Sequence, residues 1–258
     1  MEDQPERKFK RLRTFNVIAG LFLLVQAIAI VFLSNSFTLP INTYYLHLNA
    51  TTQVLAPVQN TIYQLRVGLL CALFLLISTI DHLLMASPLA NRWYVKNLKK
   101  HVNYARWYDY ALSSSVIILV IALLSGVYDI AALIPLFCIN ATMNLFGLMM
   151  ELHNQKTEKT NWTAFIFGSF AGVIPWIVIA IYFVGATQNA SVPTFIYYIL
   201  ASLAFFFLLF PVNMFLQYKK VGRWKDYLYG EYIYRSQYRG KDCVGVAGVC
   251  RNAQIIAR

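Results

Sequence analysis

The chain has 258 residues, of which 59% are hydrophobic and only 13% are charged, and its formal net charge is +11. This composition is too apolar for an ordinary soluble domain of this length. The positive charge alone would suit a nucleic-acid partner, but the Lys and Arg residues are confined to segments between apolar blocks, so we expect no nucleic acid. The sequence has no His/Cys cluster with metal-site spacing and no nucleophile or phosphate motif, and it therefore predicts no enzyme.

The apolar blocks define the expected helices. Blocks of about 20 residues are long enough to cross a bilayer, and six of them cover residues 13–34, 65–86, 99–126, 130–152, 162–185 and 193–217. A long loop joins the first two. From about residue 228 the chain offers an atypical seventh segment, in which charges interrupt the apolar character. We expect an all-α membrane protein with a single domain over residues 1–258.

The charges alternate between successive connections. Lys and Arg concentrate in the N-terminus and in the connections 87–103, 151–161 and 218–226, whereas the intervening connections have none. Basic connections mark the cytoplasmic side of a membrane protein. The alternation therefore predicts a multi-pass protein with a cytoplasmic N-terminus and a long external loop after the first helix.

An aspartate interrupts the third apolar segment, within the stretch RWYDYALSSS at 106–115. A charge at the bilayer centre costs about 2.5–3.5 kcal/mol on insertion scales, so it normally faces the bundle interior beside a partner. In a helix that begins near Lys100, Asp109 would lie about 13 Å along the axis, near mid-bilayer. Arg106 and Ser113 share its helix face. Either Arg106 and Asp109 form a pair that anchors the helix end, or Asp109 is the counterion of a buried cation elsewhere in the bundle.

Other polar side chains lie in the apolar segments. His82 is either a snorkelling residue or a polar pocket residue that accepts protons, and Glu151 is expected at the membrane interface. Asn140 and Asn144 are four residues apart, which places them on one helix face and favours hydrogen bonds to a neighbouring helix. Trp176 is a candidate ligand-pocket residue, although packing against lipid is the plainer expectation for most of the aromatic residues.

Four segments resemble the heliorhodopsin family. They are LRTFNVIAGLFLLVQ near the N-terminus, SSSVI after RWYDY, NATMNLFGLMMELHN in the fourth apolar block, and PVNMFLQYKKVGRWKDYLYGEYIY at the end of the sixth. The resemblance runs from about residue 12 to residue 234. It implies a rhodopsin-like bundle of seven transmembrane helices with a cytoplasmic N-terminus, all-trans retinal as cofactor, and a homodimer in the lipid membrane.

The resemblance assigns a role to the interrupted third segment. Asp109 takes the position of the counterion of the retinal Schiff base, which is usually glutamate in the family, and Arg106, Trp107 and Ser113 belong to the same motif. Retinal bound to a lysine as a protonated Schiff base is a buried cation, and a buried cation needs a negative partner nearby. The resemblance therefore implies a reason for an aspartate within the third apolar segment.

The resemblance extends to an internal polar network. His82 matches a histidine of the family's polar cluster, and Glu151 matches a glutamate at the end of the fourth helix. Asn140 and Trp176 are candidates for the network and the retinal pocket. Leu23 stands where the family has a companion histidine in the first helix, so this chain departs from the usual proton-accepting cluster.

The seventh segment departs from the family most. After Tyr234 the chain reads RSQYRGKDCVGVAGVCRNAQIIAR, with charged residues where an apolar span is expected. When permitted codons for this stretch are shifted by one nucleotide, they encode ALSIVAKTALAWQVFA, which resembles the family's seventh helix. Lys241 is a lysine in both frames and is therefore the candidate for Schiff-base attachment. We expect a seventh helix that is damaged, as printed, by a frameshift from about residue 235.

Three functions remain open at this stage. The first is a light receptor of heliorhodopsin type that senses or signals through an unknown partner rather than pumping ions strongly. The second is light-driven or light-gated proton transport through Asp109 and His82. The third is an opsin-like protein without chromophore that acts only through partners, which the damaged tail would favour.

Overall fold

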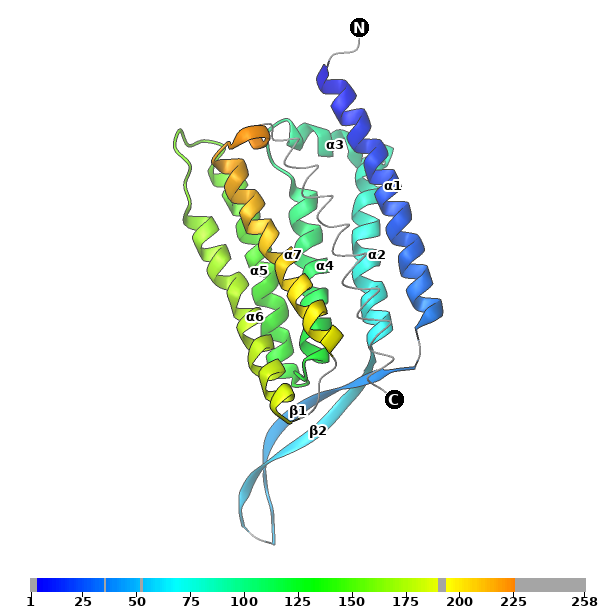
Figure 1. The fold of residues 1–258 in the computed structure, drawn as a ribbon, viewed down its shortest axis with the longest axis vertical. Coiled ribbons are helices and arrows are strands. Elements are labelled where there is room, and N and C mark those ends of the chain that lie inside the picture. Colours follow the sequence, from blue (N-terminus) through cyan, green and yellow to red (C-terminus); the bar gives the residue numbers. More distant parts are fainter. Residues whose placement is uncertain (1–3, 35, 52, 190–193, 226–258) are drawn as a thin grey trace.

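The computed structural model describes residues 4–34, 36–51, 53–189 and 194–225 (Figure 1). Lys241 and the seventh segment lie outside the described residues. The elements are α1 (Gln4–Leu33), β1 (Thr38–Leu48), β2 (Leu55–Arg66), α2 (Val67–Ala86), α3 (Pro88–Leu98), α4 (Tyr104–Leu124), α5 (Ile130–His153), α6 (Thr163–Asn189), α7 (Thr194–Tyr218) and the 3₁₀ helix η1 (Gly222–Lys225).

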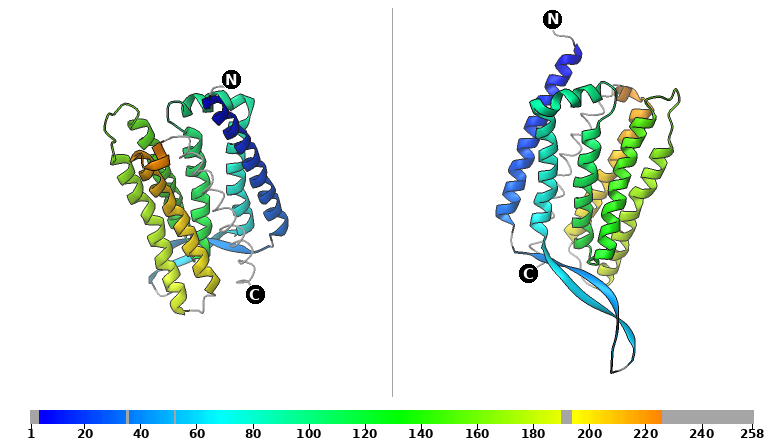
Figure 2. Two further views of the ribbon diagram at one scale, coloured as in Figure 1. Left: turned by 45° about the horizontal axis from the view of Figure 1, so that its top comes forward. Right: turned by 180° about the vertical axis from the view of Figure 1, so that it is seen from behind.

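The described part is a helical membrane bundle. Six of its helices are long and apolar enough to cross a membrane, namely α1, α2, α4, α5, α6 and α7. They correspond to the six predicted segments and run side by side along a common direction (Figure 2). Exposed apolar side chains such as Phe170 and Leu208 point outward from the bundle, as expected where lipid replaces water as the solvent.

Helix α4 is the centre of this bundle. Buried residues make up 78% of its most apolar window, against 22–44% for the other five spans. Its Ile118, Ala122 and Leu123 are almost fully buried and belong to one core cluster with Phe74 and Leu75 of α2. Most side chains of α4 therefore meet other helices, apart from a face at Tyr108 and Leu112 that is about half exposed, and this burial explains how the helix can carry polar groups away from lipid.

The long connection expected after the first helix folds into a β-hairpin, beside a bundle that is helical as predicted. Strands β1 and β2 pair in antiparallel register and project beyond the end of the bundle (Figure 1). The backbone N–H of Asn42 donates to the carbonyl oxygen of Tyr128 at 2.8 Å, and its side-chain oxygen accepts from the Thr61 hydroxyl at 2.9 Å. The first bond ties the base of the hairpin to the α4–α5 connection, and the second joins β1 to β2.

A short helix also changes the start of the third span. The connection at 87–103 folds into α3, which begins with Ser87 as its N-cap and Pro88 in its first turn. Tyr94 and Leu98 of α3 are buried against Leu12 and Met85. As a result α4 begins at Tyr104, five residues later than the predicted segment.

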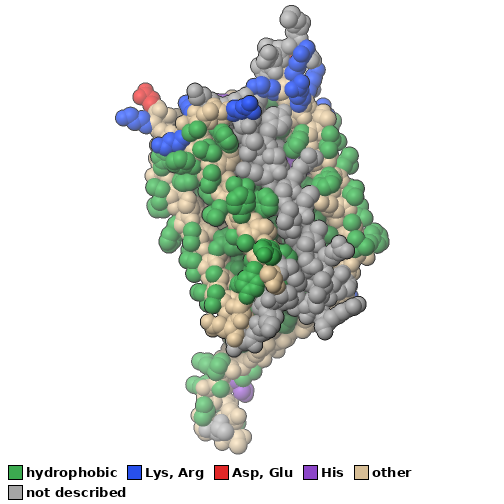
Figure 3. All heavy atoms as spheres, in the orientation of Figure 1, with side chains coloured by type: hydrophobic (Ala, Val, Ile, Leu, Met, Phe, Trp, Pro, Cys, Tyr) green, Lys and Arg blue, Asp and Glu red, His purple; other side chains and the backbone are tan. Residues whose placement is uncertain are grey.

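The basic residues gather at one end of the molecule. In Figure 3 the Lys and Arg side chains lie at the end that carries the N-terminus, and hydrophobic side chains cover the flanks of the bundle. Arg66, the last residue of β2, is at the hairpin end instead. The charge alternation seen in the sequence therefore corresponds to a physical asymmetry between the two ends.

Candidate functional site

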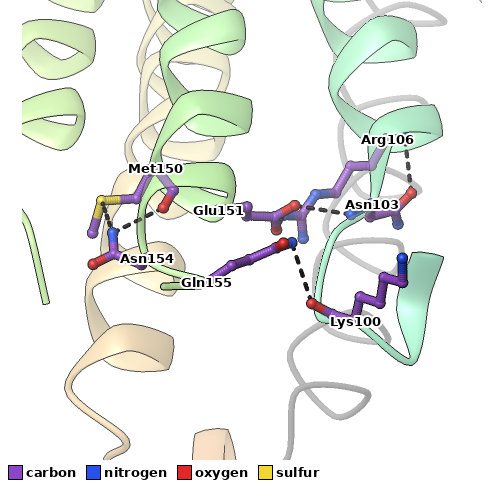
Figure 4. Close-up of polar contacts among 7 residues, drawn as sticks. All are labelled: Lys100, Asn103, Arg106, Met150, Glu151, Asn154 and Gln155. Carbon is purple, nitrogen blue, oxygen red and sulfur yellow. Dashed lines mark hydrogen bonds and ion pairs between the residues drawn. The ribbon is translucent and has the colours of Figure 1, made fainter. Parts of the chain in front are cut away.

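Arg106 forms a buried ion pair at the basic end of the bundle. Its guanidinium Nη2 pairs with Glu151 Oε1 of α5, and both residues are about 2% exposed (Figure 4). Asn103 connects the same groups, because its backbone N–H donates to Glu151 Oε2 at 2.9 Å while its side-chain oxygen caps α4 by accepting from the Arg106 backbone N–H at 3.1 Å. The guanidinium also lies over the ring of Trp107, with Cζ 4.3 Å from the ring centroid.

Of the alternatives for Arg106, the structure shows an ion pair with Glu151, because the guanidinium reaches sideways to α5 instead of along its own helix. Glu151, expected at the membrane interface, lies at the basic end of the bundle, where α4 and α5 enclose it. Arg106 and Glu151, which lie 45 residues apart in the sequence, therefore meet in one buried pair.

Asp109 points toward α2 and is 6% exposed. Its Oδ1 accepts a hydrogen bond from the hydroxyl of Ser78 at 2.8 Å. The hydroxyl of Ser113 donates to the backbone carbonyl of Asp109 at 2.8 Å. Because α4 begins at Tyr104, the carboxylate lies about 7.5 Å along the helix rather than the expected 13 Å.

His82 lies one helical turn from Ser78 on the same face of α2. Its Nδ1 is 3.2 Å from the side-chain oxygen of Asn16 on α1, and both residues are buried. Leu23 of α1 belongs to the apolar core. Asn16 and Ser78 were missed in the sequence, although a polar residue inside an apolar span is the signal that could have found them.

Serine and asparagine side chains join α4 to α5. Nδ2 of Asn140 donates to the hydroxyl oxygens of Ser114 and Ser115 at 2.9 and 3.0 Å, and Nδ2 of Asn144 donates to Ser114 at 3.0 Å. Each serine hydroxyl in turn donates to the backbone carbonyl four residues earlier, at 2.6 Å. The predicted hydrogen bond from this asparagine pair to a neighbouring helix is confirmed.

A cavity of about 420 Å³ lies between α4, α5, α6 and α7. Its wall is mostly apolar, and six of its 19 lining residues are aromatic, among them both candidate tryptophans, Trp107 and Trp176. Trp176 packs edge-to-face against Phe207 with ring centroids 5.2 Å apart. The volume falls in the range of about 300–1,000 Å³ that is typical of small-molecule sites, which are mostly apolar with a few placed polar groups.

Glycines make room for this cavity. A Cβ atom at Gly147 of α5 would overlap the indole ring of Trp107, and a Cβ at Gly172 of α6 would come 2.5 Å from the sulfur of Met143. Both glycines line the cavity. The large side chains can therefore lie across the helix backbones, and the wall that results suits an apolar, conjugated ligand such as retinal.

The cavity and the carboxylate lie on different sides of α4. Trp107, Tyr110 and Ser114 line the cavity, whereas Asp109 bonds to α2. Neighbouring residues of a helix point about 100° apart, which separates Asp109 from Tyr110. The structure thus brings Trp107 and Trp176 together at the cavity and places Asp109 and His82 in a separate polar layer between α1, α2 and α4.

Metal chemistry has no support in the described part of the chain. Within those residues, no group of three or more His, Cys, Asp or Glu side chains could hold a metal ion.

The Arg106–Glu151 pair yields a stability prediction. Glu151→Leu or Arg106→Leu alone should destabilise the protein by about 3–5 kcal/mol, because each leaves an uncompensated buried charge. The double variant should recover most of that loss, and thermal inactivation of the detergent-solubilised protein measures it. Two single losses that simply add in the double variant would show that the two side chains are not coupled.

Comparison with known proteins completes the description of the site. The comparison with curated proteins gives no match. The family model "Heliorhodopsin" matches residues 12–235, which is most of the chain and includes Asp109, His82, Arg106 and Glu151. The chain belongs to the heliorhodopsin family, whose members are rhodopsin-type retinal proteins.

Proposed function

We propose that this retinal protein is a light receptor that signals, with Asp109 as the counterion of the chromophore. The observation that carries the proposal is a carboxylate buried to 6% exposure inside an apolar bundle, held by the Ser78 hydroxyl. All-trans retinal on a lysine supplies visible absorption, isomerisation and a positive charge at its linkage. Asp109 provides the negative charge that a buried cation requires, and the aromatic cavity provides room for the apolar part of the ligand.

Signalling is favoured over strong ion pumping by the distribution of carboxylates. A pump needs proton-exchanging carboxylates on both sides of the chromophore. Among the described residues, Asp109 is buried within the span, whereas Glu151 is already balanced by Arg106 at the basic end. Leu23 in place of the family histidine removes a further proton acceptor from α1. Movement of charge relative to Asp109 after illumination would instead act on the helices packed around α4.

The proposal includes an orientation and an assembly. The basic end faces the cytoplasm, with the N-terminus, because Lys and Arg mark that side of membrane proteins. The hairpin then lies outside the cell. By analogy with the family the protein forms a homodimer in the membrane, and the partner that receives its signal is a further protein of unknown kind.

Asp109→Asn tests the counterion. In a pigment formed with all-trans retinal by a chain whose seventh helix is restored, the substitution should shift the absorption maximum to longer wavelength and lower the pH at which the linkage loses its proton, because the stabilising negative charge is gone. Spectra recorded across a pH titration measure both effects. Thr142→Val is the matched control, since that hydroxyl donates to the Cys138 carbonyl on the exposed face of α5. An unchanged spectrum and titration in Asp109→Asn would assign the counterion to another group.

The orientation is tested by labelling of single cysteines in intact cells. In a background with the native cysteines replaced, Ala50→Cys near the tip of the hairpin should react with a membrane-impermeant maleimide, whereas Lys99→Cys after α3 should not. Both positions are exposed, so access to the reagent depends on the side of the membrane. Labelling of position 99 but not of position 50 would reverse the proposed orientation.

The tail is tested by restoring the seventh helix. The family match ends at residue 235, where the apolar character also stops. A chain with ALSIVAKTALAWQVFA after Tyr234 should form a coloured pigment with all-trans retinal, and replacing the lysine of that segment by alanine should abolish the colour. The printed chain should form little or no pigment, because charged residues at mid-bilayer are costly. A stable pigment formed by the printed chain would refute the frameshift.

A further inference from the structure

The apolar cavity has a polar spot on its α4–α5 wall. Ser114 and Asn144 both line the cavity and belong to the hydrogen-bonded network between the two helices. Ser114 has no capacity left, since its hydroxyl hydrogen goes to the Tyr110 carbonyl and its oxygen accepts from the amides of Asn140 and Asn144. Of these two residues, Asn144 is therefore the one that can still form a hydrogen bond with a ligand.

The orientation of the Asn144 amide is fixed by its partners. Its Nδ2 donates to Ser114 Oγ at 3.0 Å and to the backbone carbonyl of Asn140 at 2.9 Å. A flipped amide would place Oδ1 against that carbonyl oxygen, and two acceptors repel. Both hydrogens of the amide are therefore committed inside the protein.

The amide oxygen is left as an acceptor. No described residue donates a hydrogen bond to Oδ1 of Asn144, and this oxygen is not among the sealed polar atoms that lack a partner. Because Asn144 lines the cavity, its oxygen is available to a donor placed there. Ser169 on α6 adds a hydroxyl to the opposite wall, but a hydroxyl can donate or accept and so imposes no donor on the ligand.

We propose that Asn144 makes the cavity select a retinal that carries a hydroxyl on its ring over unsubstituted retinal. The aldehyde end of the ligand is reserved for a lysine and the polyene chain is hydrocarbon, so the ring is the part that can carry a donor. Asn144 also lies across α4 from Asp109, which suits contact with the end of the ligand remote from the linkage. The inference rests on the proposed function, in that a retinal-type ligand occupies this cavity.

The expected preference is modest but measurable. Unsubstituted retinal would bury Oδ1 of Asn144 without a donor, and a site that hydrogen-bonds a ligand group disfavours the analogue that lacks it. One net hydrogen bond corresponds to about a fivefold difference in affinity. The effect is a ratio between two ligands in the same protein, so a general loss of stability in a variant cancels.

The test compares three probes on the full chain in lipid nanodiscs: all-trans-retinal, ring-hydroxylated all-trans-retinal and ring-methoxylated all-trans-retinal. Quenching of tryptophan emission reports binding, because Trp107 and Trp176 line the cavity, and it requires no reaction with a lysine and no colour. The hydroxylated probe should bind about fivefold more tightly than unsubstituted retinal. The methoxylated probe should gain nothing, since its oxygen carries no hydrogen.

Variants assign the preference to one side chain. Asn144→Leu should bring the hydroxylated and unsubstituted probes to equal affinity, because the acceptor oxygen is gone. Thr142→Val is the matched control on the exposed face of α5, because its hydroxyl bonds the Cys138 carbonyl at 2.8 Å and lies away from the cavity, and it should keep the preference.

The outcomes separate this inference from the proposed function. Equal affinities for hydroxylated and unsubstituted retinal in the unmodified chain would overturn the inference while retinal binding stands. A preference that survives Asn144→Leu would also overturn it, by assigning the contact to another group. Absence of quenching by all three probes would contradict the occupation of this cavity by retinal, and with it both proposals.

Discussion

Polar groups inside an apolar bundle must find partners within the protein, and this constraint organises the molecule. Lipid offers no hydrogen bonds, so each buried polar side chain either meets another helix or lies in an internal space. Helix α4 satisfies the constraint by occupying the centre of the described bundle. Its polar side chains consequently divide among its neighbours: Asp109 bonds to α2, Arg106 to α5, and Ser114 and Ser115 to the asparagines of α5.

The polar side chains of α4 therefore form three groups of contacts along the helix. The Arg106–Glu151 pair closes the basic end, where the guanidinium also stacks on Trp107 and so connects the pair to the cavity wall. Asp109 lies less than one further turn along α4 and bonds to α2, in the layer that contains Ser78 and His82. The serine–asparagine network then fixes α4 against α5 beside the cavity. Asp109 does not line the cavity, but it lies on the same helix as residues that do, so a change of its charge would act on a helix of the cavity wall.

The sequence predicted the six apolar spans and the charge asymmetry well, because bilayer thickness and hydropathy act on each segment independently of its neighbours. It predicted the asparagine contacts from a spacing of four residues, which depends only on helix geometry. It did not predict that Arg106 pairs with α5. Because Arg106 shares a helix face with Asp109, the sequence was compatible both with a pair between these two residues and with a partner on another helix. The hairpin was missed because the hydropathy signal of its strands is weaker than that of a membrane span. Asn16 and Ser78 were missed because a single polar residue in an apolar span does not indicate which residue it will contact.

The central claim, that Asp109 responds to the state of the chromophore, is tested most directly by light-minus-dark infrared difference spectroscopy of the retinal-loaded protein with a complete seventh helix. The account predicts a carboxyl band that appears on illumination, is lost in Asp109→Asn and persists in Glu151→Gln, because Glu151 is balanced by Arg106 in the dark and remains so. A carboxyl band that survives in Asp109→Asn and disappears in Glu151→Gln would contradict the account and move the light-sensitive charge to the basic end of the bundle.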